Sequence, residues 1–266
     1  MLQYYQALYR HHQREGRTQL IMARFNLRFV SKSLLRKTEV NLIIPSLDLH
    51  GVISNKNDRY YRDSTQKYPL IILLSGFNDD NEAWLYQTNI FSLCSEYGVA
   101  AALIGGENKW YLDQGPIDSW HNFIEKELPD FLYGNFTMLD QSKLPVIGGV
   151  SMGGYGALYN GLKSPEKYSA IMALSPATKP DDIVDEKQHG TLKELFLQAK
   201  GKLPYTYISV GDKDFIYELS KEFDGWLTEN SIGANYSFVE GYAHTWDLWR
   251  IEIVKFLQEL KNKKII

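Results

Sequence analysis

A serine between glycines lies where an apolar stretch ends, in the segment PVIGGVSMGGYGALYNGL over residues 145–162. Ser151 stands between Gly149 and Gly153, in the pattern Gly-x-Ser-x-Gly. The residues before it predict a strand and those after it a helix, with no loop between them. A serine on so sharp a turn has a strained backbone and an exposed hydroxyl, as a nucleophile requires. The alternative is a close strand–helix junction that only needs small residues, and the flanking strand and helix favour the nucleophile.

A serine nucleophile needs a general base, and on such a fold the chain order is serine, acid, histidine. Of the six histidines, only His189 and His244 follow Ser151. His189 lies in a charged, loop-like stretch that is typical of a solvated surface. His244 lies between the expected last strand and the final helix, at the edge of the sheet that carries Ser151. It is therefore the predicted base.

The acid is expected directly after the strand predicted over residues 205–211, where Asp212 and Asp214 compete. Asp212 follows the strand at once and fits a cap of the turn or of the next helix. Asp214 lies three residues beyond Gly211, which lets the chain turn back towards His244. We favour Asp214, whose carboxylate would hold the imidazole in the tautomer that accepts the serine proton.

Two backbone N–H groups are predicted to form an oxyanion hole. Met152 opens the helix after Ser151, so its N–H lies among the free donors of a helix N-terminus. The second donor is expected in the loop after the strand at 70–76, where Gly76 permits a tight turn and the N–H of Phe77 is the candidate.

Continuous apolar runs alternate with helical patterns along most of the chain. Such runs are typical of strands buried on both faces of a parallel sheet, and the alternation predicts a three-layer α/β sandwich. An opening hairpin is expected at 24–32 and 39–45. The other predicted strands are 70–76, 98–106, 145–151, 168–176, 205–211 and 236–240, and the main helices are 81–97, 118–133, 215–227 and 245–261. We expect one domain over 23–266 with a small insertion around 177–202, and an N-terminal extension over 1–22 with Met22 as an alternative start.

Composition and charge limit the classes of partner. The chain has 266 residues, a net charge of −3 and an isoelectric point near 6.1. It therefore lacks the excess of positive charge that is typical of proteins that bind nucleic acid or an anionic membrane. The single cysteine, Cys94, suits a reducing compartment, and no run is long enough to span a bilayer, so a cytoplasmic location is expected. The acidic residues Asp181, Asp182, Asp185 and Glu186 lack the histidines of a metal cluster and fit a solvated cap. No metal or cofactor is expected.

Several motifs together resemble one branch of the α/β hydrolases, the tributyrin-esterase or esterase D-like family. They are GGVSMGGYGAL, GDKDFIYE, GYAHTWDLW, SKSLLRKTEVNLIIP and WYLDQG. The branch includes short-chain carboxylesterases, S-formylglutathione hydrolases, feruloyl and acetyl-xylan esterases and mycolyltransferases. The resemblance covers about residues 23–256 and implies an α/β-hydrolase fold, a triad of Ser151, Asp214 and His244, and oxyanion donors at Phe77 and Met152.

The chain departs from the family pattern at two places near the predicted oxyanion hole. Ser75-Gly76 stands where the family usually has His-Gly. The segment at 105–113 lacks the proline-aspartate usually found at its start. The packing of the oxyanion loop is therefore left open by the resemblance.

These residues predict a serine carboxylesterase acting on short acyl esters, with a small-molecule or carbohydrate-linked ester as substrate. The insertion at 177–202 is short for a deep lipase lid. The substrate pocket is expected to include Trp110, Tyr111 and Trp246, with ordinary core packing as the alternative. Two rival functions remain open: an acyltransferase with the same triad, and an inactive hydrolase fold that only binds. The oligomeric state is not determined by the sequence.

Overall fold

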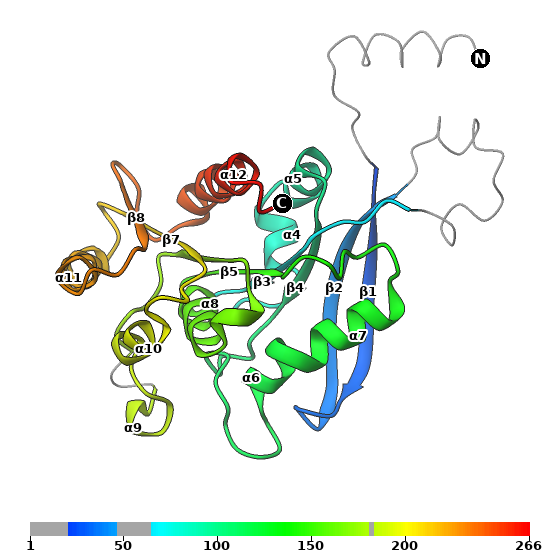
Figure 1. Cartoon of the computed structure of the whole chain (residues 1–266), viewed down its shortest axis with the longest axis horizontal. Coiled ribbons are helices and arrows are strands. Elements are labelled where there is room, and N and C mark those ends of the chain that lie inside the picture. Colours follow the sequence, from blue (N-terminus) through cyan, green and yellow to red (C-terminus); the bar gives the residue numbers. More distant parts are fainter. Residues whose placement is uncertain (1–20, 47–64, 181–183) are drawn as a thin grey trace, which may run out of the picture.

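A mostly parallel sheet forms the centre of the molecule (Figure 1). The structure is a computed structural model that describes residues 21–46, 65–180 and 184–266. Within these residues the sheet has eight strands in the order β1-β2-β4-β3-β5-β6-β7-β8. The strands are β1 Ile21–Ser31, β2 Arg36–Ser46, β3 Leu70–Leu74, β4 Ala100–Ile104, β5 Val146–Val150, β6 Ala170–Leu174, β7 Tyr205–Gly211 and β8 Asn235–Val239.

The burial of the central strands is typical of a parallel sheet covered on both faces. Every residue of β3, β4, β5 and β6 is buried, so both faces of the central sheet are covered. Strands β3 to β8 pair in parallel, and each has a helical crossover or a long connection to the next. The hairpin of β1 and β2 adds to one edge with antiparallel pairing, through β2 and β4. This is the predicted three-layer α/β-hydrolase architecture.

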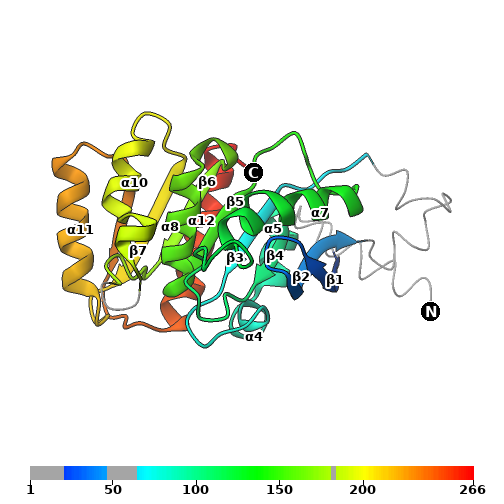
Figure 2. The same cartoon turned by 90° about the horizontal axis from the view of Figure 1, so that it is seen from below.

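Helices form one layer on each face of the sheet (Figures 1 and 2). One buried cluster joins the sheet to the helices α4 Ala83–Gln87, α5 Ile90–Tyr97 and α12 Trp246–Asn262. The opposite cluster joins it to α6 Trp120–Asn122, the π-helical turn Phe123–Glu127, α7 Leu128–Asn135, α8 Met152–Lys163, α10 Leu192–Ala199 and α11 Tyr217–Glu229. Within the described ranges, no helix is both long enough and apolar enough to cross a bilayer.

Three helices differ from the sequence prediction. The single helix expected at 81–97 is two helices, because Thr88 adopts an extended conformation and its hydroxyl donates to the carbonyl of Trp84 at 2.6 Å. The helix expected at 118–133 contains a π-helical turn at its centre. The helix expected from Phe215 begins at Tyr217, so Phe215 is not on its buried face.

Two of the predicted segments fall partly outside the described residues. Of the N-terminal extension expected over 1–22, only the last two residues are described; they belong to β1, where Met22 pairs with Pro45. Residues 181–183, with Asp181 and Asp182 of the acidic stretch, also lie outside. The described part of the insertion around 177–202 carries α10 and a short helix, α9 Glu186–His189.

Candidate active site

Strand β5 passes directly into helix α8, and Ser151 is the residue between them. Its backbone has φ 54° and ψ −117°, a conformation that residues other than glycine rarely adopt. A side chain at Gly149 would place Cβ 2.2 Å from the carbonyl oxygen of Gly153, and one at Gly153 would place it 2.4 Å from that of Leu74. Both positions therefore require glycine, as the Gly-x-Ser-x-Gly pattern indicates. The turn projects the serine hydroxyl at the carboxyl end of the strand.

Three side chains from distant parts of the chain form a continuous hydrogen-bonded line. His244 Nε2 lies 2.9 Å from Ser151 Oγ, and His244 Nδ1 lies 2.9 and 3.0 Å from the two carboxylate oxygens of Asp214. The Asp214 side chain is fully buried, whereas that of His244 is 18% exposed. Because a carboxylate only accepts hydrogen bonds, Nδ1 carries the ring proton and Nε2 is free to accept from the serine hydroxyl.

The loops after β7 and β8 hold the acid and the histidine together. The N–H of Lys213 donates to the carbonyl of Tyr242 at 2.9 Å, which ties one loop to the other. Asp214 also accepts the N–H of Ile216 at 3.1 Å, so its carboxylate is fixed from a second side. Asp212 does not contact His244; its carboxylate accepts the N–H of Gly241 at 2.7 Å and supports the turn before the histidine.

Two aromatic rings enclose the imidazole of His244. The ring of Phe215 has its centroid 4.6 Å from that of His244, and Trp249 meets it edge-on at 5.1 Å. Trp249 is buried and its indole N–H donates to Ser175 Oγ at 3.0 Å, whereas Phe215 is 82% exposed. The sequence placed Phe215 and Trp249 in the helices expected at 215–227 and 245–261, and neither contact with His244 was predicted from it. The position of Phe215, directly after Asp214, was the available signal.

The two predicted oxyanion donors both adjoin Ser151. Met152 is the first residue of α8, so its N–H has no acceptor within the helix. Phe77 follows β3 in a loop where a Cβ built on Gly76 would lie 3.7 Å from that of Ser151. Among the backbone hydrogen bonds of the described loops, none uses the N–H of Phe77 as donor. Both N–H groups are thus free to bind a developing negative charge.

An acidic side chain, Asp79, belongs to the same loop as Phe77. The carboxylate of Asp79 would lie 3.3 Å from a Cβ at Gly76. Partial burial and the nearby carboxylate of Asp80 raise the pKa of Asp79, and a hydrogen bond from the backbone of Gly76 offsets part of this shift. The raised pKa shows that the environment disfavours a negative charge at Asp79.

The three residues predicted to bind substrate are placed differently from one another. Tyr111 has no exposed surface, and its hydroxyl donates to the carbonyl of Ser75 at 2.9 Å. It therefore does not line a pocket, which corrects the sequence prediction: an apolar ring with a bonded hydroxyl fits the core better than the rim. Trp110 is also buried and packs edge-on against Tyr155 at 5.5 Å. Trp246 is partly exposed and stays a candidate.

The other downstream histidine lies away from this line of residues. His189 packs edge-on against Tyr159, with ring centroids 6.2 Å apart, about two turns along α8 from Ser151. Burial lowers the pKa of His189. It borders an open pocket with Lys163 and Glu194, and it makes no contact with the serine.

The sheet order, the sharp turn at Ser151 and the line from hydroxyl to imidazole to carboxylate define a serine hydrolase of the α/β-hydrolase class. The sequence profile of the Esterase family matches residues 53–260, so the chain belongs to that family. The resemblance to the esterase D-like branch is thereby confirmed.

Relatives of known activity agree with this assignment. An acetyl esterase of Caldicellulosiruptor saccharolyticus is 28% identical over 258 residues, which cover 86% of this chain and 94% of the relative. An S-formylglutathione hydrolase of Arabidopsis thaliana is 30% identical over 139 residues, covering 44% of this chain and 49% of the relative. The chain is a serine hydrolase that acts on carboxylic esters.

Solved structures share the fold. An S-formylglutathione hydrolase of Staphylococcus aureus superposes with a TM-score of 0.76 at 18% identity, covering 90% of this chain and 98% of that one. A ferulic acid esterase of Anaeromyces mucronatus in complex with ferulic acid gives a TM-score of 0.66 at 17% identity, covering 90% of each chain.

Proposed function

We propose that this chain is a carboxylesterase that hydrolyses short-chain acyl esters, with Ser151 as nucleophile, His244 as general base and Asp214 as the acid that orients it. The observation that carries the proposal is the continuous line from Asp214 through His244 to Ser151, in which each contact is 2.9–3.0 Å long. A serine hydroxyl is a weak nucleophile on its own, and such a line is what activates it.

The first half of the reaction acylates the enzyme. His244 Nε2 takes the hydroxyl proton as Ser151 Oγ attacks the ester carbonyl carbon. The carbonyl oxygen becomes an oxyanion that accepts hydrogen bonds from the N–H groups of Phe77 and Met152. Asp214 stays ionised and stabilises the imidazolium. His244 then gives its proton to the leaving alcohol as the C–O bond breaks, which leaves an acyl group on Ser151.

The second half of the reaction returns the enzyme to its starting state. His244 removes a proton from a water molecule, whose oxygen attacks the acyl carbon and forms a second oxyanion at the same two N–H groups. Collapse of this intermediate breaks the bond to Ser151 Oγ, which regains its proton from His244. The carboxylic acid is released.

Similarity to an acetyl esterase supports a short acyl group in the substrate. The relative that aligns over nearly its whole length, at 94%, is an acetyl esterase. The alcohol part of the substrate would lie on the side of His244, where Phe215 offers an exposed aromatic surface. The proposed substrate is a small-molecule ester or a carbohydrate-linked ester.

Hydrolysis of nitrophenyl esters tests the proposal. The wild-type chain is expected to hydrolyse the acetate and butyrate faster than the octanoate, and Ser151→Ala is expected to lose this activity while keeping its circular dichroism spectrum. A fluorophosphonate probe should label the wild type and not the variant. Undiminished hydrolysis by Ser151→Ala would contradict the mechanism. A transester product as the main product when an alcohol is added would instead indicate an acyltransferase.

A further inference from the structure

We propose that Tyr111 and Asn108 are positioning residues that hold the oxyanion donor Phe77 in place. They act through the oxyanion loop, here residues 75–80, and neither touches the substrate. The inference rests on the proposed function, because it assigns a role to these residues in a reaction at Ser151. It concerns the segment at 105–118, which we call the brace loop.

The hydroxyl of Tyr111 is bonded to the backbone just before the oxyanion donor. It lies 2.9 Å from the carbonyl oxygen of Ser75 and 3.2 Å from that of Ile104. The carbonyl of Ser75 belongs to the peptide that precedes Gly76, and the N–H of Phe77 belongs to the next peptide. The N–H of Ser75 also donates to Ile104 at 3.1 Å. The tyrosine therefore fixes the plane of the neighbouring peptide and, through it, the direction of the donor.

The chain leaves a space for the ring of Tyr111 that only glycines provide. A Cβ at Gly106 would lie 2.6 Å from the Tyr111 ring, and one at Gly156 would lie 2.5 Å from it. Gly156 belongs to α8, the helix that begins after Ser151. On the same helix Asn160 donates to the carbonyl of Tyr111 at 3.2 Å. The ring thus joins the helix of the nucleophile to the loop of the oxyanion donor.

A second contact holds the oxyanion loop on the other side of Phe77. The N–H of Asn78 donates to Asn108 Oδ1 at 2.7 Å, and Asn108 Nδ2 donates to Asn78 Oδ1 at 3.0 Å. Both asparagines have a positive φ, 63° for Asn78 and 58° for Asn108, which asparagine tolerates better than most residues. Phe77 is consequently held between one contact from Tyr111 and one from Asn108.

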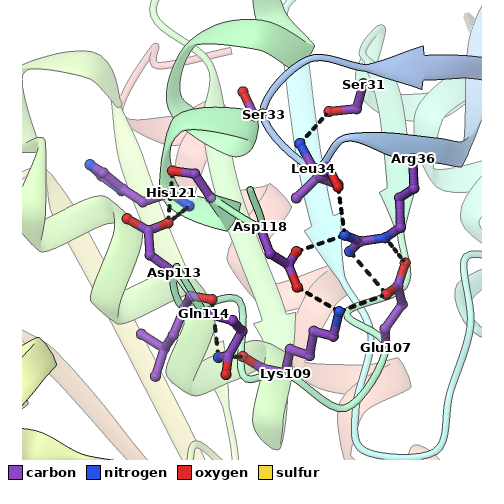
Figure 3. A network of polar contacts seen from close by, with 12 residues as sticks. Ser31, Ser33, Leu34, Arg36, Glu107, Lys109, Asp113, Gln114, Asp118 and His121 are labelled. Carbon is purple, nitrogen blue, oxygen red and sulfur yellow. Dashed lines mark hydrogen bonds and ion pairs between the residues drawn. The ribbon is translucent and has the colours of Figure 1, made fainter. Parts of the chain in front are cut away.

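The brace loop itself is anchored to the hairpin of β1 and β2 by a network of charges (Figure 3). Arg36 donates to Glu107 at 2.9 Å and to Asp118 at 2.7 Å. Lys109 donates to the second oxygen of Asp118 at 2.6 Å. The brace loop is thus tied to Arg36 of β2 at Glu107 and Asp118, on either side of Tyr111 in the chain.

This arrangement has a kinetic consequence. Oxyanion donors accelerate a reaction because they are already oriented when the charge develops. A donor that is free to rotate stabilises the transition state less, while the binding of the neutral substrate changes little. Loss of a positioning contact should therefore lower kcat and leave KM nearly unchanged.

Tyr111→Phe tests the role of the hydroxyl, because it removes the single proton that Ser75 O and Ile104 O share and keeps the ring. We expect kcat for nitrophenyl butyrate to fall about tenfold, less than the ~10²–10³-fold typical of deleting a donor outright, with KM within about twofold. The affinity for a trifluoromethyl ketone, which forms an oxyanion on the serine, should fall by the same factor as kcat.

Asn108→Gly tests the second contact independently, since glycine keeps the positive φ without the amide. It should change kcat and the ketone affinity in the same direction.

Tyr207→Phe is the matched control. It also removes a buried tyrosine hydroxyl, which donates to Glu252 at 2.7 Å on the opposite helical layer. It should lower the melting temperature without changing kcat per folded enzyme. Wild-type values of kcat and ketone affinity in both Tyr111→Phe and Asn108→Gly would overturn the inference. So would a rise in KM without a fall in kcat. Absence of any Ser151-dependent activity in the wild type would instead contradict the proposed function.

Discussion

Asp212 and Asp214 are separated by one residue and yet have different partners. Asp214 is fully buried and receives His244, whereas Asp212 receives the backbone N–H of Gly241. The chain turns after Gly211, where β7 ends. Asp212 and Asp214 are therefore not on a strand, and their side chains point in different directions. Both carboxylates are hydrogen-bonded, and only one can orient an imidazole.

Replacing each aspartate by asparagine should separate these roles. Asp214→Asn is expected to lower kcat by roughly 10³–10⁴-fold, because an amide no longer favours the tautomer that accepts the serine proton. Asp212→Asn keeps an oxygen that can accept from Gly241 and should stay within a fewfold of wild type. Steady-state hydrolysis of nitrophenyl butyrate measures both. Equal losses in the two variants would contradict the assignment of the acid.

At the scale of elements, the junction of β5 and α8 and the anchor of the brace loop decide the geometry of the site. The strand and helix approach so closely that Gly153 faces the carbonyl oxygen of Leu74 with no room for a side chain. The brace loop keeps its place through charged contacts instead. A substitution in the junction and one in the anchor should each change the free energy of unfolding.

Gly153→Ala should destabilise the protein, and Gly225→Ala should not. A Cβ at Gly153 would lie 2.4 Å from Leu74 O and would force the strand and helix apart, at a cost of about 1–3 kcal/mol or more in the free energy of unfolding. Gly225 lies within α11 with no atom within 4 Å of its Cβ position, so alanine there should stabilise by about 0.5–1 kcal/mol. Urea unfolding of both variants measures the contrast. A Gly153→Ala protein as stable as wild type would show that the junction can relax.

Asp118→Asn should destabilise the protein in a pH-dependent way. Burial alone would raise the pKa of Asp118, but hydrogen bonds from Lys109 and Arg36 outweigh it and lower the pKa below the usual value of 3.8. The ionised carboxylate is therefore the form that stabilises the fold. Its contribution to stability is complete above the unfolded-state pKa and is lost as the pH falls through the folded-state pKa.

Urea unfolding from pH 7 down to about pH 3.5 checks this dependence. The difference in stability between wild type and Asp118→Asn should narrow as the pH falls below about 4. A difference that stays constant or widens on acidification would contradict the role of the ionised carboxylate.

At the scale of the whole molecule, the parallel sheet brings the site together. The serine, the acid and the histidine follow β5, β7 and β8. Because these strands are parallel, their carboxyl ends meet at one edge, so His244 contacts Ser151, 93 positions away in the chain, and Asp214, 30 positions away. The two helical layers exclude water from both faces and give the edge its rigidity.

Cys94 reports on the integrity of this core. It is 1% exposed, between α5 and the sheet, and burial raises its pKa to about 12. Only the thiolate reacts with iodoacetamide, so the native protein should remain unlabelled at pH 8 and react fully in urea. Mass spectrometry of the alkylated protein measures this. Rapid labelling in native buffer would show that the layer formed by α5 and α12 opens without global unfolding.

The sequence by itself determined the order of the strands along the chain and the turn at Ser151. Continuous apolar runs and a glycine on each side of a serine are local patterns, and local patterns decide local structure. The expected chain order of serine, acid and histidine left two candidates for the base, His189 and His244. The position after the strand at 205–211 left two candidates for the acid, Asp212 and Asp214. The helix start at Met152 and the turn at Gly76 predicted an oxyanion hole, and the resemblance to a family implied the same two donors.

Tertiary contacts alone decided what the local patterns left open. The helix expected from Phe215 begins at Tyr217, which leaves Phe215 to cover His244, and Tyr111 was assigned to a pocket and is instead hydrogen-bonded to the oxyanion loop. The loop in which Ser75 replaces the usual histidine is held by the Ser75 hydroxyl, which donates to the carbonyl of Asp80 at 2.6 Å, and by Tyr111. Each of these facts depends on which distant segment lies opposite, and packing between segments has no signature in the spacing of residues along one of them.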